Sequence, residues 1–528
     1  MNAGNDGIID SITRRKLLGG AGATLALGSL AGCSGNTESS SKLKFAQAKG
    51  PIEFDPIVLN DVPSAEIAQL IFDSLYTYGA ETELNPSIAK SMPEVERGGQ
   101  RWIVELKDDA TFQNGDTVTA EDVTYTFRQP VKESTENAGE FNMIESATAV
   151  DEKTVQFDLK YQFGAFKHYL PFEIVSKSAR EGNKQSFNKE NPVGAGPYEF
   201  DEWKQGEYVR LKKWGDYWAD PTPNVETIEF KPVTEGTTRV TTLKTGKNDV
   251  IKTVPPNSWS TVENMDKASI NAVPSVSYFY LAFNCNEGPT QNAEVREAID
   301  YLVSMDEAVS QFVEPSGVRQ YAPVPEQVSE EWDFPVDDWK GIRHEKDIDR
   351  GKSMLESSDA VPSDWSARII VPPDNKREQV GISVANGIKE AGFDATVQRL
   401  DWGKFTNQYV TGEASDYNMF TLGWSGAADP DTFMYFLFSQ EMEGVTNGSY
   451  YDNDTVDQQI MDARESTDRD ERKRLYEEAV PTLLEDRVHL PAYALKNNFG
   501  VRNRVSDFAA HPIDQFHFTS GHNNVSLQ

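Results

Sequence analysis

Alternating apolar and polar positions predict several β-strands in the first half of the chain. Between residues 101 and 107, the side chains of Trp102, Val104 and Leu106 share one face, as in a strand with one buried side. The same alternation predicts three further strands, at Val155/Phe157/Leu159, Val209/Leu211 and Ile228/Phe230.

Helical spacing is more frequent in the second half. Apolar residues recur every three or four positions between 295 and 303, which predicts a helix with one buried face. Residues 455–466 and 469–485 predict two charged helices, the second of them interrupted at Pro481. An earlier helix is expected to begin at the capping box formed by Thr119 and Asp122.

Residues 367–400 follow the order strand, helix, Gly392, strand, which is typical of a βαβ unit with parallel strands. Together with the strands of the first half, this predicts a mixed α/β fold. A chain of 528 residues exceeds the size of a single core, so at least two lobes are expected.

The net charge of −33 restricts which partners the chain can bind. Such a chain is repelled by nucleic acids and by anionic lipid head groups, so neither is expected to bind it. The acidic residues are scattered along the sequence, which favours adaptation to high salt; an ordinary acidic protein stays the alternative. With 38% hydrophobic residues the chain can form a folded core.

The N-terminus has the features of an export signal. Arg14 and Arg15 precede the uncharged run from Leu17 to Gly32, and adjacent arginines resemble the twin-arginine signal that exports folded proteins. The run ends in Leu30-Ala31-Gly32-Cys33, which resembles the lipobox of prokaryotic lipoproteins. We therefore expect Cys33 to carry lipid, followed by a polar tether. A membrane-spanning anchor and a chance cysteine are the alternatives.

A set of motifs occurs in collinear order along the chain: Phe54-Asp55-Pro56, Ile71–Leu75, Pro86–Ala89, Leu106–Phe112, Asn114-Gly115, Thr119–Val123, Val193–Tyr198, Tyr217-Trp218, Phe283-Asn284, Val295–Ile299, Gly423-Trp424, Asp429-Pro430-Asp431, Phe433, Tyr450, Asp457, Asp468, Arg472 and Leu475-Tyr476. These motifs are similar to those of the peptide/nickel class of extracellular solute-binding proteins, family 5. With the acidic charge and the lipobox, the chain resembles a haloarchaeal lipoprotein of that class. Ala195 stands where the family usually has Thr. The resemblance covers nearly the whole chain after the signal.

This resemblance implies a two-lobed periplasmic-binding-protein-like fold of class II, cluster C type, with an extra inserted domain. The expected parts are a signal (1–33), a tether (34–41), lobe I in three pieces (42–79, 190–280, 490–528), the inserted domain (80–189) and lobe II (281–489). It also implies a monomer on the outer face of the cell membrane. That monomer would capture a small solute, di- or oligopeptide first, for the permease of an ABC importer, with no cofactor and no metal. A sugar or a metal chelate stays open as the ligand, and a sensor as the partner.

The segment from Gly423 to Pro430 contains the first candidate ligand residues, Gly423, Trp424 and Asp429. Glycine permits close approach, an indole face gives apolar contact, and Asp429 could pair with a cation of the ligand. The resemblance places an acidic residue here against the amino group of bound peptides, but Ala427 stands where that acid often lies. A cap on the turn at Pro430 is the equal alternative for Asp429.

Three further segments contribute candidates. The loop Asn60-Asp61-Val62 corresponds to one that lines the cleft in relatives, with a polar turn as the alternative. Tyr278 and Tyr280 share one face of a predicted strand near the crossover between lobes; core packing is the alternative. Asp401-Trp402 ends the second strand of the βαβ unit, where open sheets tend to place ligands; a surface turn is the alternative. These candidates are Asn60, Asp61, Val62, Tyr278, Tyr280, Asp401 and Trp402.

An exported hydrolase is the rival class, and the sequence does not favour it. Gly423-Trp424-Ser425-Gly426 has Ala427 where a nucleophile elbow needs glycine. The zinc pattern His-Glu-x-x-His does not occur. His511, His517 and His522 lie close in sequence, and we interpret them as part of a solvated tail. Cys285 is expected to be packed in the core. Because none of these patterns supports catalysis, no enzyme activity is predicted.

Overall fold

The computed structural model describes residues 41–80, 82–518 and 524–528. The predicted export arginines Arg14 and Arg15 and the predicted lipid-bearing Cys33 lie outside these residues.

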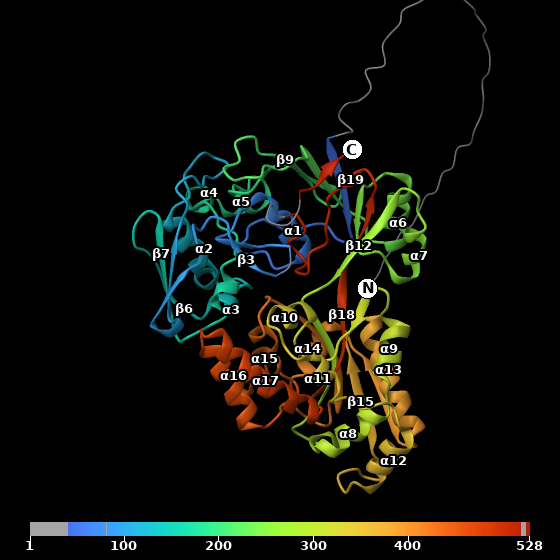
Figure 1. The fold of residues 1–528 in the computed structure, drawn as a ribbon. Helices are drawn as coiled ribbons and strands as arrows, with labels where there is room; N and C mark the ends of the chain where they lie inside the picture. Colours follow the sequence, from blue (N-terminus) through green and yellow to red (C-terminus); the bar gives the residue numbers. More distant parts are fainter. Residues whose placement is uncertain (1–40, 81, 519–523) are drawn as a thin grey trace, which may run out of the picture. The chain divides into compact units, whose positions relative to one another are not determined.

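A 12-stranded sheet forms the centre of the fold (Figure 1). Its path runs β16 (Asp394–Arg399), β15 (Ser366–Val371), β17 (Met419–Ser425), β13 (Ser277–Phe283), β18 (His489–Arg502), β11 (Val250–Lys252), β1 (Lys42–Gln47), β10 (Thr227–Pro232), β9 (Tyr208–Lys213) and β8 (Tyr198–Lys204). Two more strands, β12 (Ala268–Pro274) and β14 (Gly317–Arg319), pair with β18.

The long strand β18 belongs to two halves of this sheet. Its first residues pair with β13 and β14, and its last residues pair with β11 and β12. We call the half around β1 and β8–β12 lobe I, and the half around β13–β17 lobe II. Their largest buried clusters are separate, one built around Leu43 and Phe45 and the other around Leu281 and Ile369. This is the two-lobed α/β architecture that the sequence predicts.

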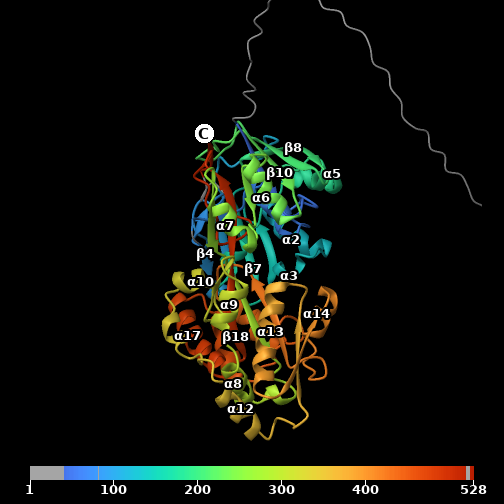
Figure 2. The same ribbon diagram turned by 90° about the vertical axis from the view of Figure 1, so that its right-hand side faces the viewer.

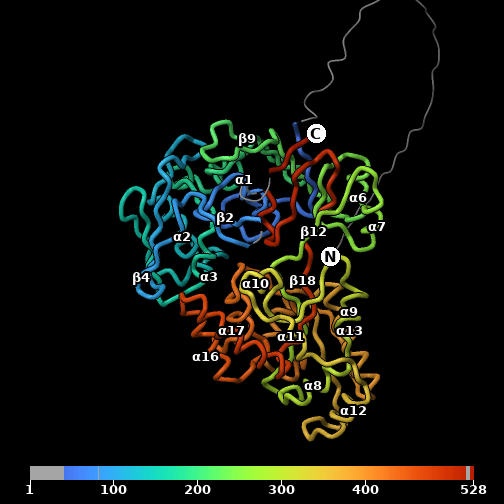
Figure 3. The backbone as a smooth tube through the Cα atoms, in the orientation of Figure 1, coloured from blue at the N-terminus to red at the C-terminus, as the bar shows by residue number. Residues whose placement is uncertain are grey.

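Within the described residues the chain crosses between the lobes twice, and the two crossings lie side by side. The first passes through residues 275–277 between β12 and β13, and the second runs along β18, as the backbone tube of Figure 3 allows the reader to follow. The amide of Ser275 donates to the carbonyl oxygen of Leu495 at 2.8 Å, and the amide of Leu495 donates to Ser277 Oγ at 3.2 Å. The covalent links between the lobes in the described part of the chain are therefore gathered at one place.

Helices cover the sheets of both lobes (Figure 2). Lobe I carries α1 (Val62–Ile71), α6 (Gly236–Thr245) and α7 (Trp259–Glu263). Lobe II carries α8 (Ala293–Tyr301), α9 (Met305–Phe312), α10 (Glu326–Glu331), α11 (Val336–Lys340), α12 (Ile348–Ser357), α13 (Asn375–Glu390), α14 (Trp402–Gln408), α15 (Asp431–Phe438), α16 (Asp454–Glu465) and α17 (Arg469–Glu485).

Residues 80–189, which we call the inserted segment, contain a separate four-stranded sheet. Its order is β4 (Glu94–Glu96), β5 (Arg101–Glu105), β7 (Thr154–Leu159) and β6 (Ile144–Ala149). With it lie the helices α2 (Ala120–Glu133), α3 (Ala138–Phe141), α4 (Lys177–Arg180) and α5 (Lys184–Lys189). Two small sheets have two strands each. One pairs β2 (Tyr76–Tyr78) with β3 (Leu84–Pro86), and the other pairs β19 (Val505–Ser506) with β20 (Ser526–Leu527). The exact domain boundaries stay a prediction.

The local predictions are largely confirmed. Thr119 and Asp122 form the capping box of α2, and β15, α13 and β16 form the predicted parallel βαβ unit. One expectation is wrong: Pro481 does not interrupt the last helix, since α17 continues through it. The residues around the proline, among them Tyr476, Ala479, Val480 and Leu483, are buried, and this packing offsets the hydrogen bond that proline cannot donate.

Candidate ligand-binding site

The carboxyl ends of three neighbouring strands meet at one edge of lobe II. β15 lies between β16 and β17 and runs parallel to both. The helices α13 and α14 begin just after β15 and β16, so their first turns lie at this edge together with the end of β17. Open α/β sheets place ligands outside the carboxyl ends of their parallel strands, which makes this edge the candidate site.

Trp402 is the most exposed aromatic residue among those predicted for the site. It opens α14 and has 53% of its surface exposed, with its ring stacked on Phe405 at 6.0 Å. The guanidinium of Arg377, in the first turn of α13, lies 5.9 Å from the same indole. Asp401 has a different role, because its carboxylate caps α14 by accepting the amide of Lys404 at 3.1 Å.

Gly423 leaves space on β17 for an aromatic ring of the neighbouring strand. Gly423 on β17 pairs with Phe279 on β13, and a Cβ added to the glycine would lie 2.1 Å from the Phe279 ring. That ring stacks on Tyr493 of β18 with centroids 4.7 Å apart. The guanidinium of Arg377 lies 5.7 Å from it on the helix side. The glycine therefore makes room for the Phe279 ring beside the first turn of α13.

Trp424 lies on the opposite face of β17. Its half-buried indole stacks on Phe436 of α15 with centroids 5.6 Å apart. Its Nε1 is shielded from solvent and has no hydrogen-bond partner among the described residues. A buried indole N–H normally finds an acceptor, so an oxygen of a bound molecule or of water is the expected partner.

Tyr278 and Tyr280 belong to the core in this structure. Both are buried, their rings stack on each other at 4.8 Å, and Tyr280 also stacks on His489 at 4.1 Å. The half-exposed ring of the same strand is Phe279, on the other face, and it was not among the predicted ligand residues. Alternation separates the two faces of a strand, but it does not reveal which face the helices leave accessible.

Asp429 is fully buried and its carboxylate is already paired. Oδ1 and Oδ2 accept hydrogen bonds from the guanidinium of Arg472 at 2.5 and 3.0 Å. Oδ1 also accepts the amide of Asp431 at 2.9 Å, which is the turn cap named as the alternative to a ligand role. Burial favours a raised pKa, but the Arg472 guanidinium outweighs it and lowers the pKa of Asp429 to about 2. The carboxylate stays ionised within a buried pair.

The loop Asn60-Asp61-Val62 begins α1 in lobe I. Asp61 caps this helix, because its Oδ1 accepts the amide of Ser64 at 3.0 Å. Asn60 and Val62 are exposed on either side of it. The loop therefore forms the polar turn named as the alternative, and a contact with a ligand stays a prediction.

The inserted segment contacts lobe II close to Asp429. His168 Nε2 lies 3.5 Å from Asp429 Oδ2, and its Nδ1 is 3.3 Å from the hydroxyl of Tyr78. Burial is the main reason that the pKa of His168 falls to about 3, so its imidazole is neutral at physiological pH. The guanidinium of Arg464 lies 4.4 Å from the ring of Phe163 in the inserted segment.

The structure also places His511, His517 and Cys285, which the sequence analysis considered when it weighed a hydrolase. His511 and His517 are buried, so the prediction of a solvated tail is wrong for them; His522 lies outside the described residues. The reason is tertiary, since His517 packs on Phe499 with centroids 4.5 Å apart. Cys285 is a packed thiol, as predicted, and burial raises its pKa to about 11. Within residues 41–80, 82–518 and 524–528, no group of three or more metal-ligating side chains could hold an ion.

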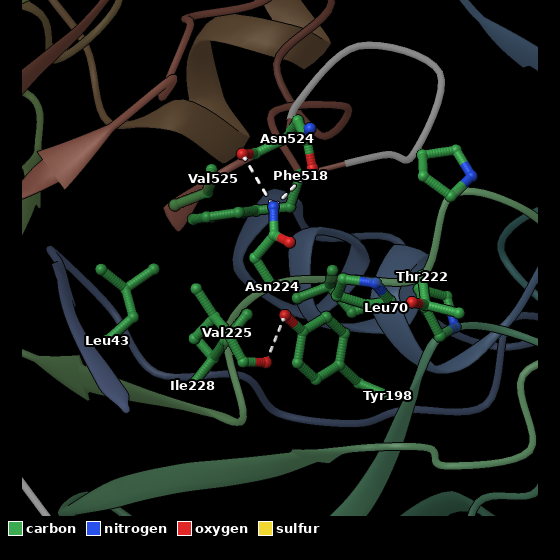
Figure 4. A pocket seen from close by; sticks show the side chains of 13 residues that line it. Leu43, Leu70, Tyr198, Thr222, Asn224, Val225, Ile228, Phe518, Asn524 and Val525 are labelled. Carbon is green, nitrogen blue, oxygen red and sulfur yellow. Dashed lines mark hydrogen bonds between the residues drawn. The ribbon is translucent and has the colours of Figure 1, made fainter. Parts of the chain in front are cut away.

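A small cavity lies in lobe I, away from the candidate site (Figure 4). Its volume is about 30 Å³, room for a water molecule or two but not for a peptide. Leu43, Tyr198 and Phe518 line it, and the Asn224 amide donates a hydrogen bond to the side-chain oxygen of Asn524 at 2.6 Å.

Among the described helices, none is both long and apolar enough to cross a membrane.

Comparisons with known proteins agree with this architecture. Residues 83–444 match the profile of the bacterial extracellular solute-binding proteins, family 5 (middle region). The oligopeptide-binding protein AppA of Bacillus subtilis is 25% identical over 522 residues, covering 92% of this chain and 94% of the relative. The probable D,D-dipeptide-binding periplasmic protein DdpA of Escherichia coli is 23% identical over 485 residues, 89% of this chain and 92% of its own.

Solved structures share the fold. The ABC transporter substrate-binding protein CtaP of Listeria monocytogenes superimposes with a TM-score of 0.80 at 23% identity, covering 92% of this chain and 99% of the other. AppA in complex with a nonapeptide gives 0.72 at 22% identity, with the same coverage. The match to the family profile spans most of the sequence, and this chain belongs to the family 5 extracellular solute-binding proteins.

Proposed function

We propose that this protein captures a peptide or peptide-like solute between its two lobes and delivers it to the permease of an ABC importer. The carrying observation is the aromatic edge of lobe II at the ends of the parallel strands, where the rings of Trp402 and Phe279 lie beside Arg377. Trp424 adds a half-buried indole on the other face of β17. Aromatic faces bind varied side chains without requiring one shape. The peptide-binding relatives support the peptide class.

We also propose that the protein is held outside the cell by a lipid on Cys33 after export directed by Arg14 and Arg15. The lipobox-like sequence and the twin arginines support this. The net charge of −33 supports a protein adapted to high salt. A monomer is the form we expect to meet the permease.

Thermal melting in several molar salt tests the function. The purified protein is melted with dipeptides, longer peptides, sugars and a nickel–histidine complex, each at a range of concentrations. A true ligand at about 100 times its Kd stabilises the folded protein by about 2.7 kcal/mol. Stabilisation by peptides alone is the expected result. Stabilisation by the sugar or the nickel complex, with no response to peptides, would overturn the peptide assignment.

A further inference from the structure

The acceptor pattern for N-linked oligosaccharides is Asn-x-Ser/Thr with x other than proline, and it occurs three times in the sequence. The asparagines are Asn447, Asn453 and Asn524. An oligosaccharide on such an asparagine is bulky and needs a surface position. Because the export that we propose for this chain passes a folded protein, the chain meets the oligosaccharide only after folding. The folded structure then decides which asparagine can be modified.

Asn447 is closed to modification in the folded protein. It is 1% exposed, its Nδ2 donates to the carbonyl oxygen of Ser439 at 3.1 Å, and its Oδ1 accepts the amide of Ser449 at 2.9 Å. Ser449, the third residue of this pattern, is also buried, with its Oγ 3.0 Å from His489 Nε2. An oligosaccharide on Asn447 would have to displace part of the core of lobe II.

Asn453 is committed to the start of α16. Its Oδ1 accepts the amides of Thr455 and Val456 at 3.1 and 3.2 Å, and its Nδ2 donates to the hydroxyl of Tyr451 at 2.9 Å. The acceptor pattern therefore lies in the cap and first turn of a helix. A transferring enzyme could grip Asn453 and Thr455 together only by removing this cap and unwinding the turn, which the folded protein opposes.

Asn524 differs from both, because its side chain is exposed and lies outside any helix. The side-chain amide of Asn224 donates to its Oδ1 at 2.6 Å and to its main-chain oxygen at 3.4 Å (Figure 4). This contact holds the oxygen of the Asn524 carboxamide and leaves its nitrogen, the atom that bears the sugar, outside it. The rest of the pattern is extended, since Ser526 begins β20 and pairs with Ser506 of β19.

Asn524 lies at the end of lobe I that is remote from lobe II. It lines the same small cavity as Leu43, near the start of β1 (Figure 4). β18 enters lobe I from the crossing, and β11 is antiparallel to it, so β11 and the parallel β1 both run toward the crossing. The start of β1 is therefore the far end of the lobe. An oligosaccharide here would stand beside the predicted tether and clear of the candidate ligand-binding site.

We propose that Asn524 carries an N-linked oligosaccharide, whereas Asn447 and Asn453 do not. The donor is an oligosaccharide linked to a lipid phosphate on the outer face of the membrane. A bond forms between Asn524 Nδ2 and the anomeric carbon of the first sugar, and the bond from that carbon to a phosphate oxygen breaks. The lipid phosphate leaves, and the amide gives up one proton. This inference rests on the proposed export and adds a modification site to it.

Mass spectrometry of the full chain, made in its own cells, tests this proposal. Four proteins are purified from the membrane fraction and the medium and then digested: wild type, Asn524→Gln, Ser526→Ala and Ser506→Ala. Ser526→Ala keeps the asparagine but removes the hydroxyl that the pattern requires. Ser506→Ala is the matched control, because Ser506 pairs with Ser526 but belongs to no acceptor pattern. Melting curves confirm that each variant is folded.

Wild type and Ser506→Ala should give a peptide containing Asn524 that is heavier by the mass of an oligosaccharide. Asn524→Gln and Ser526→Ala should lose that increase completely, and the peptides containing Asn447 and Asn453 should keep their unmodified masses in all four proteins. An unmodified Asn524 in exported wild type, or sugar on Asn447 or Asn453, overturns the proposal and leaves export standing. Wild type confined to the cytoplasm overturns the proposed export and this inference with it.

Discussion

The amide nitrogen of Gly164 donates a hydrogen bond to the carbonyl oxygen of Arg464 at 3.0 Å, which joins the inserted segment to lobe II. This contact lies between segments that are not linked directly by the chain, whereas the covalent crossings are gathered at residues 275–277 and along β18. We expect motion about those crossings to part the contact at Gly164 and to leave the crossings intact.

Gly164→Ala should hinder closure of the two lobes. An added Cβ would lie 1.9 Å from the carbonyl oxygen of Ser466, too close for the present arrangement. The expected result is a larger radius of gyration by X-ray scattering and weaker ligand binding by calorimetry. Gly139→Ala is the control, because a Cβ at Gly139 meets nothing within 4 Å. Unchanged scattering and affinity in Gly164→Ala would show that this contact does not govern closure.

Trp424 should affect both binding and stability. The stacking of the half-buried indole on Phe436 predicts that Trp424→Ala destabilises the empty protein by about 2 kcal/mol, less than for a fully buried tryptophan. Trp424→Phe keeps an apolar ring and should retain most of that stability while still weakening ligand binding, because the indole N–H is lost. Calorimetry on both variants separates the effects. Wild-type affinity in Trp424→Phe would exclude a ligand contact through the N–H group.

The ion pair of Asp429 and Arg472 should behave as a buried structural unit. Arg472→Met leaves an unpaired buried carboxylate and should destabilise the protein by about 3–5 kcal/mol. The double variant with Asp429→Asn should recover much of that loss, measured by denaturant unfolding. If Asp429→Asn instead stays stable and loses ligand affinity, the carboxylate contacts the ligand after all.

His168 should make stability depend on pH between 5 and 7. Because burial lowers its pKa in the folded protein to about 3, the unfolded chain binds a proton near pH 6.5 that the folded protein does not. The stabilisation is full above pH 6.5 and is lost as the pH falls toward 3. Between pH 7 and pH 5, wild type should lose about 2 kcal/mol more than His168→Gln. Urea titrations at both pH values measure the difference. His344→Gln is the control, because His344 is less buried than His168. Parallel pH profiles of wild type and His168→Gln would contradict this prediction.

Cys33→Ser should release the protein from the membrane fraction. If Cys33 carries the lipid, the variant loses its anchor while its solute-binding part folds as before. Cell fractionation followed by immunodetection measures the change. A variant that stays in the membrane fraction as firmly as wild type would exclude a lipid on Cys33.

The sequence by itself determined the features that depend on neighbours along the chain. The capping box at Thr119 and Asp122 and the βαβ unit of residues 366–399 follow from periodicity and capping chemistry, which act over a few residues. The collinear motifs predicted the family and the two-lobed fold. Trp402 at the end of a parallel strand could also be named, because strand ends are where open sheets place ligands.

Tertiary structure alone decided which of the candidate side chains are accessible or already paired. Asp429 finds Arg472 only when α17 packs against the start of α15, so no local pattern distinguishes a ligand contact from a buried pair. Phe279 rather than Tyr278 is half-exposed, because the packing of helices on the sheet selects the accessible face. Arg377 comes to lie over Phe279 and Trp402, which are distant in sequence, because three strands and two helices meet at one edge. Burial and charge pairing are sums over neighbours in space, and the sequence lists only neighbours along the chain.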